Sequence, residues 1–370
     1  MTLMQVLGAL IRFTFMRLKK SHFFAVLAAL IVVASFAFSL SSLLGQSGSR
    51  ISENASEYGA AQNALVVYDG YAKIPTAIQA SYKNLQSQLN QVAGVLADDQ
   101  MENGSSFSQL DLSLRQTQLK QFAYRHHIPV KDSLSYPQVQ ARMAQDRYYL
   151  SRGRNENSHI RTLADVLSSW TGLLLTVFSL FCAIIAVAVS AISDTQKSTF
   201  KGLPIKNRHY AAANFLTTAA ITLSSLVISS LLVGLFALLL GARPTISKIV
   251  FLSFGRFQAV NFWLLFVMIL VTSLVLSLLF SLLGRIIEQF TTVNYFFGIG
   301  LGLLFSLPAN IFGLLSLLNP QQILSGDAAF VTGLHMNLLP IYYLILLVLI
   351  IASYLAMTLL ADHKKGGLLS

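Results

Sequence analysis

The chain has 370 residues, of which 54% are hydrophobic and only 11% are charged. Soluble domains carry about 25% charged residues, so this composition excludes an ordinary soluble protein. The formal net charge is +11, yet segment 45–165 holds eleven acidic and twelve basic residues and is nearly neutral. The positive excess therefore belongs to the apolar remainder of the chain, where it favours a membrane orientation and not nucleic-acid binding.

The first segment, residues 1–21, has apolar residues near helical spacing and a cluster of cations, Arg17, Lys19 and Lys20, at its end. This pattern predicts a helix that lies in the membrane interface on the cytoplasmic side. The alternative is a plain cytoplasmic extension of the first span. The apolar run that follows is longer than the 7–15 residues of a signal-peptide core, so we predict an uncleaved span at 22–44.

Six apolar stretches in all are long enough to cross a bilayer, which takes roughly 20 residues. None of them contains Asp, Glu, Lys or Arg in its interior. We therefore predict an all-α polytopic membrane protein with six transmembrane helices, at 22–44, 166–192, 212–241, 260–284, 293–318 and 338–360.

Segment 45–165, between the first two spans, is predicted to form a small helical domain. An a/d stripe from Ile78 to Leu96 indicates one helix, which packs within the domain or against a second copy rather than on a ligand. Ser106 and Gln109 are spaced as a capping box for a second helix that ends near His127. A third helix is expected to start near Pro137.

The distribution of Lys and Arg predicts the orientation. The connections on the side of the N-terminus hold eleven of these residues, whereas the short loops on the opposite side hold three. Both termini are therefore expected in the cytoplasm, and segment 45–165 outside the cell.

Several kinds of chemistry are missing. The sequence has no HExxH, no G-x-S-x-G and no phosphate-binding loop. The spans also lack the ionisable groups that ion-coupled transporters use. We expect no enzyme activity, metal or cofactor in this chain, so any energy for transport would come from a partner protein that binds ATP and magnesium.

The fifth predicted span contains the sequence "GIGLGLLFSLPANIFG". Gly298 and Gly302 allow close helix approach, and Pro308 removes a backbone donor and kinks or breaks the helix. A break at membrane depth is tolerated where protein or a cavity covers it, so these three residues are candidates for a helix break in a transport pathway. The many hydroxyl residues of spans three and four favour helix packing over a substrate-lining role.

A basic stretch, "STFKGLPIKNRHYAAANFL", connects spans two and three at residues 198–216. Its Leu-Pro-Ile step followed by basic residues, together with the predicted layout of the whole chain, resembles the permease subunits of ABC-2-type exporters. In that family this cytoplasmic connection, here 193–211, carries a short coupling helix that sits on the ATPase subunit. Taken alone, the cations of this loop could equally serve only to set the membrane topology.

The resemblance implies an ATPase-coupling role for residues of this loop. The apolar members would provide a hydrophobic key, and the basic members a salt-sensitive rim. The candidate coupling residues are Phe200, Lys201, Gly202, Leu203, Pro204, Ile205, Lys206 and Arg208.

The resemblance further implies a bacterial plasma-membrane exporter that works as a dimer. Its partners would be two ABC ATPase subunits, a second copy or a related permease, and membrane lipids. The large insert is consistent with a peptide, an antibiotic or another amphipathic substrate. The alternative is a non-transporting membrane receptor or assembly scaffold that acts through the outside helical domain.

Overall fold

Within the part of the chain that the structure describes, four helices are long and apolar enough to cross a membrane. They are α2 (Phe23–Leu44), α7 (Leu163–Thr199), α8 (Asn207–Leu239) and α9 (Phe262–Glu288). Each of them coincides, to within a few residues, with one of the first four predicted spans. The prediction of a mainly helical membrane protein is therefore confirmed at this level.

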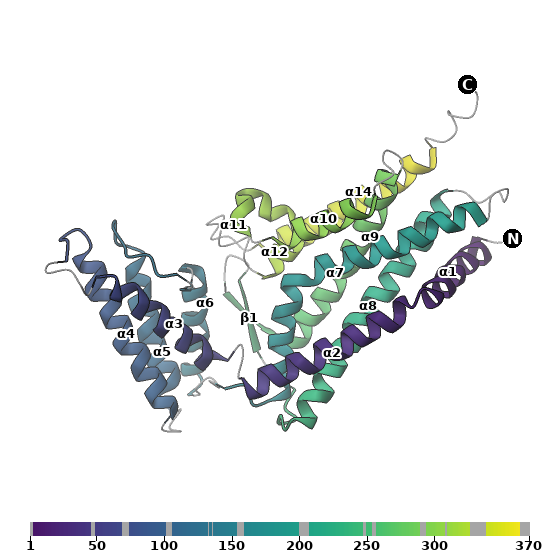
Figure 1. Cartoon of the computed structure of the whole chain (residues 1–370). Coiled ribbons are helices and arrows are strands. Elements are labelled where there is room, and N and C mark those ends of the chain that lie inside the picture. Colours follow the sequence, from purple (N-terminus) through teal and green to yellow (C-terminus); the bar gives the residue numbers. More distant parts are fainter. Residues whose placement is uncertain are drawn as a thin grey trace. The chain divides into compact units, whose positions relative to one another are not determined.

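The structure is a computed structural model of the whole chain and is shown in Figure 1. By internal contacts the chain divides into two units, which are residues 1–39, 167–239 and 247–370, and residues 40–166 and 240–246. The described residues are 3–45, 49–68, 74–100, 106–131, 133–134, 136–153, 159–199, 207–246, 249–253, 257–288, 294–307, 309–325 and 338–362.

The smaller unit contains four helices that pack as successive neighbours (Figure 1). Three of them were predicted. The second predicted helix, α5, ends at Gln121 and not near His127 as expected. The first of the four was missed, because the face that it buries is largely polar, with Arg50, Asn54 and Glu57 followed by Ala61 and Leu65. The helices are α3 (Arg50–Val66), α4 (Gln79–Gln100), α5 (Phe107–Gln121) and α6 (Tyr136–Leu150).

The predicted stripe of α4 packs inside this unit. Leu85 lies in a core cluster with Ala61 and Leu65 of α3 and with Ile128. The predicted capping box is wrong, because the Ser106 hydroxyl makes no cap hydrogen bond and instead lies 3.3 Å from a carboxylate oxygen of Asp98. The start of α5 is thus tied to the end of α4 by a side-chain contact.

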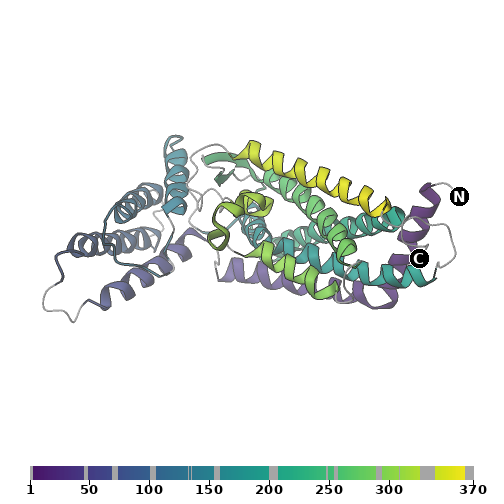
Figure 2. The ribbon, with the colours of Figure 1, turned by 90° about the horizontal axis from the view of Figure 1, so that it is seen from above.

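The larger unit contains the four long apolar helices and the N-terminal helix α1 (Leu3–Lys20). Figure 2 shows its long helices running alongside one another. The main core joins Phe178 of α7 and Ile269 of α9 to Tyr342 of α14 (Leu339–Asp362). In a second cluster, Leu10 of α1 packs on Tyr210 and Ala213, near the start of α8.

The connection before α9 corrects the all-α prediction. It contains an antiparallel hairpin of β1 (Ile249–Ser253) and β2 (Phe257–Asn261), with Val250 opposite Val260. The strands are rich in β-branched and aromatic residues, which favour extended backbone. Val260, predicted as the first residue of span four, therefore belongs to a strand, and the helix begins at Phe262.

Candidate functional site

The fifth predicted span is broken. Helix α10 (Asn294–Ser306) has 13 residues and is about 20 Å long, too short by itself for a hydrocarbon core of about 30 Å. The continuous span 293–318 is thus wrong, and the chain instead forms α11 (Ala309–Phe312), η1 (Gly313–Leu318) and α12 (Pro320–Ser325). Gly313 has a φ of 54°, a backbone conformation that is sterically strained for residues with a Cβ atom but not for glycine.

Side-chain amides satisfy the backbone where α10 ends. Asn319 donates from Nδ2 to the Phe305 carbonyl at 2.7 Å, and Gln322 donates from Nε2 to the Leu307 carbonyl at 2.7 Å. The last carbonyls of any helix lack intrahelical donors, and in an apolar surrounding an unsatisfied carbonyl costs several kcal/mol. These two amides therefore make the break compatible with membrane depth.

The break is also joined to α7. Gln321 donates from Nε2 to the Thr176 carbonyl at 3.2 Å, and the hydroxyl oxygens of Ser179 and Ser306 lie 2.7 Å apart. All three amide residues are buried, with Asn319 8%, Gln321 1% and Gln322 4% exposed. The result is a neutral polar site between apolar helices, suited to hydrogen bonding and not to proton transfer.

Gly302 fulfils its predicted role in close helix approach. A Cβ atom placed on Gly302 would lie only 2.5 Å from Cβ of Ala183 and 3.2 Å from Cα of Leu180, both on α7. Gly298 lies in the first half of α10, and its predicted role in helix approach stays a prediction. Pro308 lies outside the described residues, between Leu307 and the start of α11.

The sequence reasoning missed the three amides of the site. They occur in "LLNPQQ", directly after the apolar run that ends at Leu318. Asn319 also accepts a hydrogen bond from the Gln321 backbone N–H at 3.0 Å, as a helix-capping residue does. Asn319 followed by Pro320 is a typical helix-start pattern, and it could have predicted that α12 begins directly after the apolar run.

The hydroxyl residues of the spans make hydrogen bonds within and between helices. Thr217 and Ser281 bond back to carbonyls of their own helices, at 2.8 and 2.7 Å. Thr272 of α9 lies 2.6 Å from the Tyr342 hydroxyl of α14, and this contact links two helices without a charge. The choice between packing and a substrate-lining role for the hydroxyl residues stays a prediction.

The candidate coupling residues Phe200, Lys201, Gly202, Leu203, Pro204, Ile205 and Lys206 lie outside the described residues. Arg208 is the second residue of α8, and its side chain is not among those described. The predicted loop 193–211 is too long, because α7 continues to Thr199 and α8 starts at Asn207.

A buried cluster of charged residues forms a second polar feature, inside the smaller unit. Arg115 and Asp111 of α5 are both 0% exposed and lie 3.1 Å apart at their nearest charged atoms. Arg115 also binds Glu57 at 2.5 Å, and Arg50 contacts both Asp111 and Asp146. The cluster therefore ties α3, α5 and α6 together through charge pairs that water does not reach.

The environment of Asp111 shifts its acidity. Burial acts to raise the pKa of this carboxyl, but the guanidinium groups of Arg50, Arg115 and Arg142 outweigh burial and hold the pKa well below its ordinary value of 3.8. For Arg115, burial acts to lower the pKa, but Asp111 and Glu57 overcome burial and raise the pKa above its ordinary value. Both groups are thus charged at neutral pH.

This shift predicts an acid-sensitive unit. A carboxyl whose pKa is lowered by folding contributes stability that is present above its unfolded pKa and is lost as the pH falls towards the folded value. Below about pH 4, the stability lent by Asp111 should therefore decline. The melting temperatures of the native chain and of Asp111→Asn should differ most at pH 7, and the difference should shrink below pH 4. A difference that stays constant with pH would contradict the lowered pKa of Asp111.

Comparisons with known protein families, with curated proteins and with solved structures gave no match. In the part of the chain that the structure describes, no three His, Cys, Asp or Glu side chains are grouped so that they could hold a metal ion.

Proposed function

We propose that this chain is the membrane-spanning permease subunit of an ATP-driven ABC exporter in a bacterial plasma membrane. It would have six spans, an interfacial α1, both termini in the cytoplasm, and the α3–α6 unit outside. Two copies, or this chain and a related one, would form the pathway. Separate ATPase subunits would bind ATP and magnesium, and the substrate would be a peptide, an antibiotic or another amphipathic molecule.

The observation that supports this proposal most is the setting of the candidate coupling stretch. Helix α7 continues for seven residues beyond Ile192, the end of its apolar part, and so projects by about 10 Å. Helix α8 resumes at Asn207. Residues 200–206 thus follow a polar extension of α7 and directly precede α8, which is the place in the sequence where an element that contacts a soluble partner is expected.

A second observation concerns the start of α8. Leu10 of α1 is 1% exposed and packs against Tyr210 and Ala213, close after the candidate coupling residues. A displacement of residues 200–206 would therefore move α8 and α1 together. Since the spans carry no ionisable groups in their interiors, the driving force would enter through this connection.

The neutral amide site at the end of α10 supports a pathway role. Broken helices at membrane depth occur where protein covers them or where they line a cavity. Here Asn319 and Gln322 each donate a side-chain hydrogen bond to a carbonyl of the broken end. A rearrangement of these two bonds would let the end of α10 move during transport.

The test is to solubilise the tagged chain gently from its host and identify the proteins that co-purify. A phosphate-loop ATPase should accompany the native chain and be lost with Leu203→Asp combined with Pro204→Gly. Ile246→Asp is the matched control, because Ile246 is an apolar residue, 52% exposed, in a different connection. An ATPase absent from every sample, with a folded chain, would contradict the exporter proposal.

A receptor or assembly scaffold is the second candidate. The α3–α6 unit favours it, because this unit has its own apolar core and its own buried charge cluster. This function requires that the unit binds a ligand or protein and that residues 198–208 tolerate substitution. Normal function of the Leu203→Asp, Pro204→Gly chain in cells would favour it over the exporter.

A further inference from the structure

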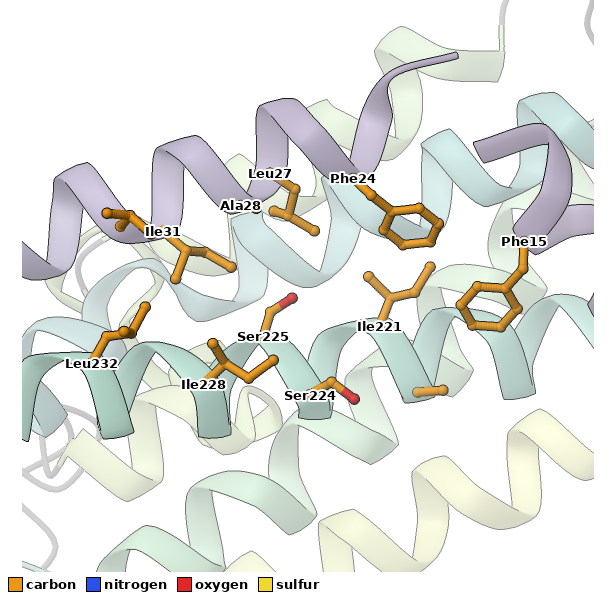
Figure 3. Close-up of a pocket in the computed structure, with 12 residues that line it drawn as sticks. Phe15, Phe24, Leu27, Ala28, Ile31, Ile221, Ser224, Ser225, Ile228 and Leu232 are labelled. Carbon is orange, nitrogen blue, oxygen red and sulfur yellow. The ribbon is translucent and has the colours of Figure 1, made fainter. Parts of the chain in front are cut away.

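An apolar groove of about 370 Å³ runs between α2 and α8, and α1 borders one end (Figure 3). Its volume is near the lower end of the range for small-ligand sites, about 300–1,000 Å³. The only hydroxyl side chains in its lining are Ser224 and Ser225. The groove is lined by Phe15, Phe24, Leu27, Ala28, Ile31, Val32, Ala220, Ile221, Ser224, Ser225, Ile228 and Leu232.

The two ends of the groove differ. Beyond Ile31 the helices close together, because Ser35 donates to the Ser229 carbonyl at 3.3 Å and Ser39 donates to the Val233 carbonyl at 3.1 Å. At the other end, the ring of Phe15 stacks on that of Phe24 at 5.7 Å between centroids. The groove therefore ends inside the helix pair on one side and at the junction of α1 and α2 on the other.

The groove is accessible from the side. In the most apolar part of α2 only 11% of the residues are buried, against 44–56% for the other three long apolar helices. Among the lining residues, Val32 is 44% and Ile228 is 50% exposed. In a membrane, lipid tails would therefore reach the groove without any movement of the helices.

The junction end carries positive charge. Arg17, Lys19 and Lys20 lie in the last turn of α1 and are exposed. Lys19 is four residues after Phe15, so both project from the same face of α1. A ligand that fills the apolar groove would thus place its outer end near the Lys19 ammonium group, which favours an anionic headgroup.

The length of the groove fits one lipid tail. Its lining on α8 extends from Ala220 to Leu232, which is about 18 Å of helix. Half of a hydrocarbon core of about 30 Å is about 15 Å, so the groove covers the depth of one leaflet. The cations would then lie at headgroup level, where Lys and Arg are favoured at membrane interfaces.

We propose that this groove binds one acyl chain of an anionic glycerophospholipid, with the phosphate held by Lys19 and, beside it, Lys20. The lipid would come from the leaflet that the N-terminus faces. It would wedge between α2 and α8 below the Ser35 contact and fix the angle between α1 and the two helices. This inference goes beyond the proposed export function and does not depend on an ATPase.

The test uses the full-length chain in detergent, titrated with phosphatidylglycerol or with phosphatidylcholine of the same acyl chains, and bound lipid is counted by native mass spectrometry. Phosphatidylglycerol should bind the native chain more tightly. The double variant Lys19→Gln, Lys20→Gln should lower the ratio of the phosphatidylglycerol affinity to the phosphatidylcholine affinity by about 25-fold, because each basic residue near an anionic surface contributes a factor of about five.

The acyl-chain part is tested by filling the groove. Ala28→Trp should weaken phosphatidylglycerol binding at least fivefold. Val33→Trp is the matched control, because Val33 lies on the same helix, is 67% exposed and does not line the groove. Both positions tolerate a large side chain, since Ala28 is exposed as well.

Three outcomes would overturn the proposal. The native chain could bind the two lipids equally, which would exclude a headgroup site. Ala28→Trp could behave like Val33→Trp, which would exclude a tail in the groove. Ala28→Trp could change the oligomeric state, measured by light scattering, without loss of lipid, and the groove would then be covered by a second copy of the chain.

Discussion

Replacing Arg115 with methionine is expected to lower the free energy of unfolding of the α3–α6 unit by about 3–5 kcal/mol. Arg115 is 0% exposed, and its guanidinium group is the partner of Asp111, Glu57 and Gln118. Methionine fills much of the same volume but leaves the carboxylates of Asp111 and Glu57 with one cation fewer. An uncompensated buried charge is among the most destabilising changes in a protein interior.

The measurement is hydrogen exchange of the full-length chain in detergent, read from peptides of α3 to α6. Arg115→Met should lose protection there and keep that of α7 to α9. Arg147→Met is the matched control, because Arg147 lies on the surface of α6, and its replacement should change stability by less than about 0.5 kcal/mol. Equal protection in the two variants would show that the cluster does not hold the unit together.

Replacing Gly302 with alanine is expected to separate α10 from α7 and to destabilise the membrane part by about 1–3 kcal/mol. The added methyl group would meet Cβ of Ala183 at 2.5 Å and Cα of Leu180 at 3.2 Å, and the second of these is backbone. Alanine is the better helix former by about 1 kcal/mol, so intrinsic propensity would predict the opposite sign. The sign of the change therefore reports on helix contact alone.

The lone cysteine of the chain provides the measurement. Cys182 of α7 is fully buried, with its thiol 3.9 Å from the Ser273 carbonyl of α9, so a thiol-reactive fluorescent dye will label it only when the packing around α7 opens on heating. Gly300→Ala is the matched control in the same helix, because a methyl group there would meet nothing within 4 Å. Gly300→Ala should have a melting temperature equal to or higher than that of the native chain, and Gly302→Ala should have a lower one.

A second substitution can rescue the first. Ala183→Gly removes the atom that the new methyl group would meet most closely, so Gly302→Ala combined with Ala183→Gly should recover part of the lost stability. The contact with Leu180 Cα would remain, and the recovery should be incomplete. If Gly302→Ala melts like Gly300→Ala, α10 does not pack on α7 through this glycine.

The sequence predicted the long apolar helices well, because each is a continuous run without charge and needs no neighbour to be recognised. It also predicted that Gly302 permits close helix approach. It failed on helix α3, where three of the five buried side chains are polar or charged, namely Arg50, Asn54 and Glu57. Hydrophobic periodicity cannot reveal a helix whose buried face is polar, because the partners that satisfy those groups lie on other helices.

The fifth span shows where sequence reasoning ended. Pro308 predicted a kink or break in this helix, and α10 ends at Ser306. The end of α10 is stabilised by Asn319 and Gln322, whose side chains supply the missing donors to carbonyls 14 and 15 residues upstream. No local pattern connects these amides to Phe305 and Leu307.

Composition and apolar run length thus determined by themselves that this is a helical membrane protein, because hydrocarbon selects for long uncharged helices whatever their neighbours. Only the tertiary structure decided the broken end of α10, the buried charge cluster of Arg115 and the groove between α2 and α8. Each of these arises from groups distant in the chain that meet when helices pack. The free energy of such contacts depends on position in space and leaves no spacing rule in the sequence.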